Sequence, residues 1–179
     1  GWVECIPAAA CHSTTDVERF YRRAGMLLCA LHTLATTDIH CENVIASGDH
    51  PVVVDLETLL SERPSDQTEG DPSEASVLRT GLVPRWQTAP DGHRFDMSGL
   101  GADGSQDPGV RVPIWHLVNT DQMSLDEGAS QPVSMTHRVA LAGAWPSVTE
   151  HLAACLQGFR DTYACVVSRR DELTLEHIV

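Results

Sequence analysis

The chain contains no lysine: its 12 basic residues are all arginines, and 25 aspartates and glutamates outnumber them. The formal net charge at pH 7 is therefore -13. Proteins that bind nucleic acids usually present a basic surface, because the phosphate backbone must be neutralised. The acidic balance argues against a nucleic acid as a partner.

Long apolar runs are missing as well. No run reaches the roughly 18 residues that a membrane-spanning helix requires, so we expect no transmembrane segment. Residues 1–4 lack the basic region and apolar stretch of a secretory signal, which favours a cytoplasmic location. An initiator methionine is also absent, so we expect the 179 residues to begin inside a longer protein.

Paired cysteine motifs are absent too. The six cysteines include no Cys-x-x-Cys pair. The length of the chain and the lack of a signal favour free thiols over disulfides. Cys11 and His12 could ligate zinc, but no second ligand pair follows at a useful spacing, so we expect no zinc site here.

The remaining composition is that of a globular protein. Hydrophobic residues make up 42% of the chain, enough for one domain with a core. Residues 2–6 are predicted to form a short strand. A capping box of Thr15 and Glu18 predicts a helix over residues 16–35. Apolar residues recur along it at helical spacing, namely Phe20, Ala24, Leu27, Leu28, Leu31 and Leu34.

Further elements are predicted after this helix. Residues 44–46 and 51–56 indicate two strands joined by a turn, and therefore a hairpin. Residues 61–74 are rich in Ser, Pro, Asp, Glu and Gly, which is typical of a mobile surface loop. Another hairpin is predicted within residues 81–98, around Pro90-Asp91-Gly92. A second amphipathic helix is predicted from near Pro146 to about Arg169.

Five polar residues that could carry chemistry flank the first predicted hairpin. Asp38, His40 and Asn43 follow the first helix, while Asp55 leaves the second strand and Glu57 stands just beyond it. Because a tight hairpin returns the chain to its starting end, Asn43 and Asp55 are expected to meet. Phosphoryl transfer requires such a set: an acidic group acts on the attacking hydroxyl, while carboxylate and amide oxygens hold magnesium against nucleotide phosphates.

Each of these residues also has a plain structural explanation, as a loop, capping or solvent-facing group. The joint pattern of Asp-x-His-x-x-Asn, a hairpin and Asp-x-Glu is much harder to explain by chance. Nucleophilic and zinc-hydrolase interpretations account for it less well. Ordinary protein kinases place His before Asp and leave a longer gap to Asn. The order found here resembles the catalytic loop of lipid kinases.

A closer resemblance covers nearly the whole chain. Its most specific segments are Arg22-Arg23-Ala24-Gly25, residues 37–46 (Thr-Asp-Ile-His-Cys-Glu-Asn-Val-Ile-Ala) and residues 51–59 (Pro-Val-Val-Val-Asp-Leu-Glu-Thr-Leu). Softer landmarks stand at residues 1–4, 81–84, 96–101, 119–121 and 158–163. Together they resemble the central part of the dehydratase domain of class II lanthipeptide synthetases (LanM type).

The resemblance implies an α+β fold with a lipid-kinase-like catalytic core, of which residues 1–179 would form a partial domain. Residues 36–60 would be its catalytic block and residues from about 146 to 179 its C-terminal helical part. It implies an enzyme that uses ATP and Mg²⁺ to phosphorylate Ser and Thr of a ribosomally made lantibiotic precursor peptide. The enzyme then eliminates the phosphate, which gives dehydroalanine and dehydrobutyrine.

Roles for the five residues follow from the motif match. Asp38 would act on the hydroxyl, Asn43 and Asp55 would hold Mg²⁺, and His40 and Glu57 would complete the site. The implied partners are the precursor peptide and the rest of the synthetase. That remainder includes a cyclase domain outside this chain, which uses Zn²⁺ to add Cys thiols.

Two parts of the family's site are missing from the sequence. The lysine that grips the ATP phosphates has no counterpart, and the Arg and Thr used for elimination are not evident before Val179. We therefore expect these 179 residues alone to be inactive. Two alternatives stay open: another phosphotransferase of lipid-kinase-like type, and a non-catalytic remnant that binds a peptide.

Overall fold

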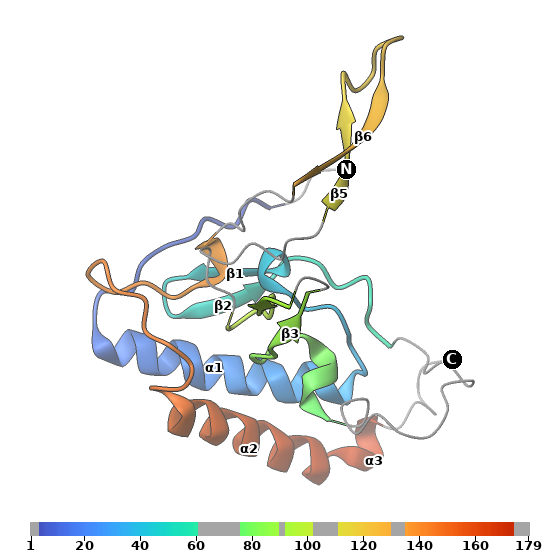
Figure 1. Ribbon diagram of the computed structural model, residues 1–179. Helices are drawn as coiled ribbons and strands as arrows, with labels where there is room; N and C mark the ends of the chain where they lie inside the picture. The colour runs from blue at the N-terminus through green and yellow to red at the C-terminus, as the bar shows by residue number, and fades with distance from the viewer. Residues whose placement is uncertain (1–3, 61–75, 90–91, 102–110, 130–134, 174–179) are drawn as a thin grey trace.

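The computed structural model describes residues 4–60, 76–89, 92–101, 111–129 and 135–173. Helices α1 (Thr14–Thr33) and α2 (Leu152–Ser168) lie side by side, and small two-stranded sheets lie on the other side of α1 (Figure 1). The described residues therefore combine helices with antiparallel sheets. The lipid-kinase-like core stays a prediction.

Helix α1 confirms the first predicted helix, with each end shifted by about two residues. Its N-cap is Ser13, whose hydroxyl accepts a hydrogen bond from the Asp16 backbone N–H at 3.2 Å. The predicted capping box of Thr15 and Glu18 is wrong, because Ser13 offers the same type of oxygen two residues earlier. Leu34, expected on the buried face, is the C-cap residue and is 41% exposed.

The buried face of α1 supplies much of the core. Its buried side chains are Val17, Phe20, Tyr21, Ala24, Leu28, Cys29 and Leu31. Ile39, Val44 and Leu82 join the same cluster from segments that follow α1 in the chain. The core therefore lies between α1 and the segments that carry the candidate site.

Helices α1 and α2 approach most closely at two glycines. A Cβ on Gly25 would lie 1.8 Å from the Cys155 carbonyl oxygen, and a Cβ on Gly158 would lie 1.8 Å from the Arg22 carbonyl oxygen. The two backbones can make this contact only because neither residue has a side chain.

None of the helices described is both long and apolar enough to span a membrane.

Helix α2 begins later than predicted and is followed by the short helix α3 (Arg170–Leu173). Pro146 lies before a turn rather than at the helix start, because the Tyr21 hydroxyl donates to the Pro146 carbonyl oxygen at 2.7 Å and holds that segment on α1. The ring of His151, the N-cap residue, stacks on Tyr21 with 5.1 Å between ring centroids. The predicted helix is confirmed from Leu152 to its end near Arg169.

Strands β1 (Val44–Ser47) and β2 (His50–Val53) form the first predicted hairpin. Strand β2 is shorter than predicted, since residues 54–56 are not in a strand. The predicted strand at residues 2–6 is wrong in its described part. Backbone pairing with β1 begins only at Ala9, whose N–H donates to the Ala46 carbonyl oxygen at 3.0 Å.

Two further hairpins complete the described structure. Strands β3 (Gln87–Thr88) and β4 (Arg94–Phe95) confirm the predicted hairpin, although Pro90 and Asp91 lie outside the described residues. Strands β5 (Arg111–His116) and β6 (Ser124–Ala129) were not predicted and extend away from the rest of the molecule (Figure 1). The predicted loop at residues 61–74 also lies outside the described residues.

Candidate functional site

The segment from Asp38 to Glu42 alternates between buried and outward-facing side chains. Ile39 and Cys41 are fully buried, while Asp38 and Glu42 are exposed and His40 is half-buried. Two backbone hydrogen bonds hold it: Ile39 N–H donates to the Thr80 carbonyl at 2.8 Å, and Cys41 N–H donates to the Met97 carbonyl at 2.9 Å. The alternation presents Asp38, His40 and Glu42 outward together.

His40 is oriented by its own backbone neighbourhood. It caps the short 3₁₀ helix at Cys41–Asn43, and its Nδ1 accepts a hydrogen bond from the Glu42 backbone N–H at 3.2 Å. With Nδ1 as an acceptor, the neutral ring carries its proton on Nε2. That nitrogen lies 4.0 Å from an Asp38 carboxylate oxygen. The imidazole therefore presents an N–H group next to the Asp38 carboxylate.

Asn43 supports Asp38 from the other side. Its side-chain amide nitrogen donates to the Asp38 carbonyl oxygen at 2.9 Å, across a backbone that has the left-handed φ of 63° at Asp38. Asp and Asn tolerate this conformation better than most residues. The amide oxygen is the atom that Asn43 can offer to a cation, because the amide nitrogen only donates hydrogen bonds.

The β1–β2 hairpin brings Asp55 next to Asn43. Val44 pairs with Val53, and the Val54 backbone N–H donates to the Asn43 carbonyl oxygen at 3.1 Å. Asp55 is exposed, and its carboxylate accepts a hydrogen bond from the Glu57 backbone N–H at 3.2 Å. The second group of predicted residues therefore returns to the end of the hairpin where the first group lies.

The segment after Asp55 is also fixed to the segment before Asp38. The Thr58 hydroxyl donates to the Thr37 carbonyl oxygen, and the Leu60 N–H donates to the Leu34 carbonyl oxygen at 2.9 Å. Within the described residues, no hydrogen bond or ion pair joins the Glu57 side chain to the other four candidates. Glu57 is thus near the site through its backbone only.

Asn43 and Asp55 offer hard oxygen donors, which fit Mg²⁺. This ion is usually held by one or two carboxylates, with phosphates and water completing its shell. In the part of the chain that the structure describes, no group of three or more His, Cys, Asp and Glu residues is arranged to hold a metal. Cys11 is a buried free cysteine, and its thiol donates to the Gly48 carbonyl oxygen at 3.3 Å.

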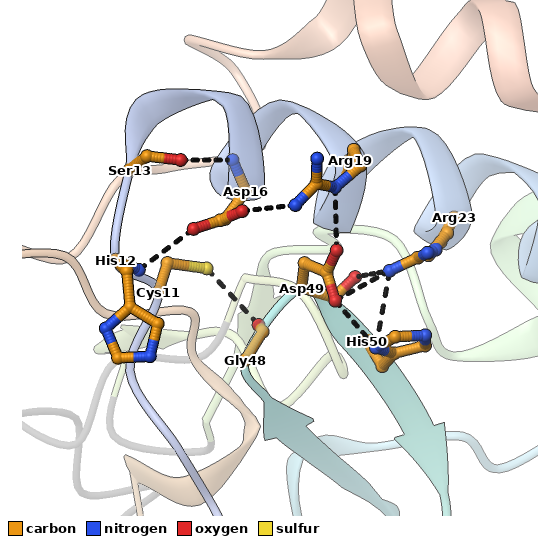
Figure 2. Close-up of polar contacts among 9 residues, drawn as sticks. All are labelled: Cys11, His12, Ser13, Asp16, Arg19, Arg23, Gly48, Asp49 and His50. Carbon is orange, nitrogen blue, oxygen red and sulfur yellow. Dashed lines mark hydrogen bonds and ion pairs between the residues drawn. The ribbon is translucent and has the colours of Figure 1, made fainter.

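The opposite end of the hairpin is bound to α1 by ion pairs, as Figure 2 shows. The Asp49 carboxylate accepts from Arg19 and from Arg23, each at 2.7 Å, and Arg23 also donates to the Asp49 carbonyl oxygen at 2.8 Å. The hydrogen bond from Arg19 is the main reason that the pKa of Asp49 lies below its ordinary value. These contacts fix the turn of the hairpin, and with it the end that carries Asn43 and Asp55.

A pocket of about 330 Å³ lies beside the outward-facing residues of the loop. Its lining combines acidic residues of that loop with basic and polar residues from later segments, namely Asp38, His40, Glu42, Leu78, Arg79, Gly81, Arg85, Gln87, Met97 and Ser98. Asp96 shapes the later segments: it is 2% exposed, and its carboxylate accepts from the backbone N–H of Arg85 and of Ser98.

The pocket contains arginines that the sequence pattern did not identify. Arg79 stands two residues before the Gly-Leu-Val-Pro landmark, and Arg85 directly follows it. Proximity to that landmark is the signal that could have found them. Their position opposite the Asp38 segment depends on the hydrogen bond between Ile39 and Thr80, which no sequence spacing predicts.

Comparisons with known proteins relate this chain to a protein family and to a protein of known name. The family described as "Domain of unknown function (DUF4135)" matches residues 1–178. The chain is also similar to the lacticin 481/lactococcin biosynthesis protein LcnDR2 of Lactococcus lactis subsp. lactis, with 41% identity over 61 residues. That match covers 34% of this chain and 7% of the relative, so it spans only a small part of the relative's length.

Proposed function

This chain belongs to the DUF4135 family, and on that premise we propose that it carries the phosphoryl-transfer site of a class II lanthipeptide dehydratase. The substrate would be a ribosomally made precursor peptide, dehydrated at Ser and Thr by phosphorylation and elimination of phosphate. Similarity to a lacticin 481/lactococcin biosynthesis protein supports a role in peptide modification. The rest of the synthetase would complete the enzyme.

The observation that carries this proposal is the meeting of the two residue groups at one end of the β1–β2 hairpin. Asn43 contacts Asp38 through its side chain and reaches the Asp55 segment through its carbonyl oxygen. A group that acts on a hydroxyl therefore stands next to a pair of oxygen donors for a cation. Phosphoryl transfer depends on positioning of this kind.

The proposed roles are those that the resemblance implies for the five residues. The Asp38 carboxylate lines the pocket, where it would orient a Ser or Thr hydroxyl and take its proton as the oxygen attacks. The Nε2–H of His40 would stabilise that carboxylate. Asn43 and Asp55 would bind Mg²⁺, and Glu57 would complete the site. ATP, when bound, would supply the phosphoryl group. Mg²⁺ would neutralise the negative charge of that group.

The test uses the full-length protein that contains these residues, expressed with a candidate precursor peptide from the same locus. Loss of water from the peptide, read by intact mass, is the expected result. Asp38→Asn and Asp55→Asn should each abolish it, since Asn keeps the shape of Asp but removes the charge. Both variants should retain the circular dichroism spectrum of the unaltered protein.

Other results would revise the proposal in defined ways. Phosphate added without loss of water would support the kinase half and contradict the elimination half. Full dehydration by both variants would remove Asp38 and Asp55 from the site. No change in any peptide of the locus would overturn the proposal in favour of a non-catalytic role.

A further inference from the structure

Arg79 is held close to the loop that carries Asp38. It precedes Thr80, a fully buried residue whose carbonyl oxygen accepts the hydrogen bond from Ile39, and Ile39 directly follows Asp38. One backbone hydrogen bond therefore links the neighbours of the two residues. Asp38 and Arg79 both line the pocket described above.

The Arg79 guanidinium has no hydrogen-bond or ion-pair partner among the residues that the structure describes, although the residue is half-buried. Neither carboxylate of the pocket, Asp38 or Glu42, pairs with it. Arginine side chains that leave bulk water usually pair with an anion or with carbonyl oxygens. The unpaired guanidinium therefore indicates that an anionic group binds at this side of the pocket.

Other lining residues support an anion at the same place. Arg85 is a second arginine among the residues that line the pocket. Ser98 is 6% exposed, and its hydroxyl has no hydrogen-bond partner within the described ranges. Buried hydroxyl groups are seldom left without a partner. The segments around Arg79 and Ser98 thus provide donors, whereas the loop at residues 38–42 provides the acidic groups.

The position of the pocket separates it from the candidate nucleotide site. Asn43, Asp55 and Glu57, which would serve Mg²⁺ and the nucleotide, are not among the residues that line it. Asp38, which would act on the peptide hydroxyl, does line it. An anion bound here would therefore belong to the peptide and not to the nucleotide.

We propose that Arg79 binds the phosphate of a phosphorylated Ser or Thr of the peptide, in the pocket beside Asp38 and His40. This inference rests on the proposed function, which supplies the phosphorylated residue. A phosphate monoester carries close to two negative charges at neutral pH and accepts bidentate hydrogen bonds from arginine. Retention of the phosphorylated residue at the site would keep it in place until the phosphate leaves.

A binding experiment tests the site directly in the full-length protein. The probes are two fluorescent peptides of one sequence, one with phosphoserine and one with serine, added without nucleotide. We expect the phosphoserine peptide to bind more tightly, and Arg79→Met to weaken its binding about tenfold or more while leaving the serine peptide unchanged. Arg160→Met is the matched control, because Arg160 is exposed on α2 and does not line the pocket.

A turnover experiment separates this inference from the proposed function. If the unaltered protein dehydrates the peptide, Arg79→Met should release phosphorylated peptide that has not lost water. Arg79→Lys should have an intermediate effect, since lysine keeps the charge but lacks the planar pair of donors. The Arg79→Lys variant also provides the test if Arg79→Met does not fold.

The outcomes lead to different conclusions. Complete dehydration by Arg79→Met, with unchanged preference for the phosphoserine peptide, would overturn the inference and leave the proposed function standing. An equal loss in Arg160→Met would also overturn it, because the effect would then be one of net charge. If the unaltered protein modifies no peptide, the proposed function fails. The inference then stands only if the protein still prefers the phosphoserine peptide and loses that preference in Arg79→Met, and it fails otherwise.

Discussion

Asp49 ties the turn of the β1–β2 hairpin to two arginines of α1. Arg19 and Arg23 stand four residues apart on the helix, so both face the same carboxylate. Their hydrogen bonds lower the pKa of Asp49, so the folded protein favours the ionised form. By linkage, this contribution to stability is present above the ordinary pKa of an aspartate and is lost as the pH falls through the lowered value.

We expect Asp49→Asn to destabilise the protein most near neutral pH. The difference in unfolding midpoint between the unaltered protein and the variant should shrink as the pH falls below about 4, where the carboxylate becomes protonated. Denaturant titrations from about pH 3 to about pH 7 measure this difference. Asp121→Asn, at an exposed turn position, is the control and should leave the midpoint unchanged. A difference that stays constant across this range would contradict the ion-pair explanation.

Sequence reasoning at the residue scale succeeds where residues are close along the chain. Asp38, His40 and Asn43 lie within six residues, and a hairpin of ten residues returns the chain to Asp55, so local rules suffice to bring them together. Arg79 could not be placed in this way. Its position depends on tertiary pairing between residue 39 and residue 80, and on buried residues such as Asp96 that shape the later segments.

At the scale of elements, the contact between α1 and α2 depends on the absence of side chains at Gly25 and Gly158. Alanine normally stabilises a helix relative to glycine by about 1 kcal/mol. At Gly158, however, the added methyl group would overlap the Arg22 carbonyl oxygen of α1, a backbone atom that cannot move aside as the end of a flexible side chain can. The helices would have to separate, which uncovers apolar surface along their whole contact.

We expect Gly158→Ala to lower the free energy of unfolding by about 1–3 kcal/mol, the usual cost of forcing extra volume into a packed contact. Chemical denaturation followed by circular dichroism measures it. Ala164→Ser is the control, because it also adds one heavy atom to α2 but at an exposed position. Its effect should stay within about 0.5 kcal/mol. A Gly158→Ala protein as stable as the unaltered one would show that the helices do not approach this closely.

The elements that sequence predicted best are the long periodic helices and the first hairpin. The error at the start of α1 arose because Ser13 and Thr15 are both good N-cap residues, and the helix uses the earlier one. The β5–β6 hairpin was missed because Pro113 and Gly128 stand inside its strands and weaken the usual strand signal. Pairing between the strands, rather than the composition of either, defines that element.

At the scale of the whole molecule, the β5–β6 hairpin differs from the rest. It extends away from the helices (Figure 1), and several of its large apolar residues are about half-exposed or more, namely Trp115, Leu117, Val118, Met123 and Leu125. A two-stranded hairpin without a covering layer is at best marginally stable in water. Helix α1, by contrast, buries one face in the core and packs against α2.

Rates of backbone hydrogen exchange should therefore distinguish the β5–β6 hairpin from the elements that form the core. Backbone amides of β5 and β6 should exchange much faster than those of α1 and of the β1–β2 hairpin, because local opening of the former uncovers little buried surface. Deuterium uptake by peptide fragments at neutral pH measures both in one experiment. Equal protection of β5–β6 and α1 would show that another surface covers the projecting hairpin.

The six cysteines of this chain divide by burial: Cys5 and Cys165 are exposed, whereas the other four are buried. Cys41 lies between His40 and Glu42, and burial raises the pKa of its thiol to about 11. A thiol reagent can reach it only when the loop leaves its place against Met97. The rate at which Cys41 becomes labelled would thus time the opening of the loop that carries Asp38 and His40, in the unaltered protein and without an introduced cysteine.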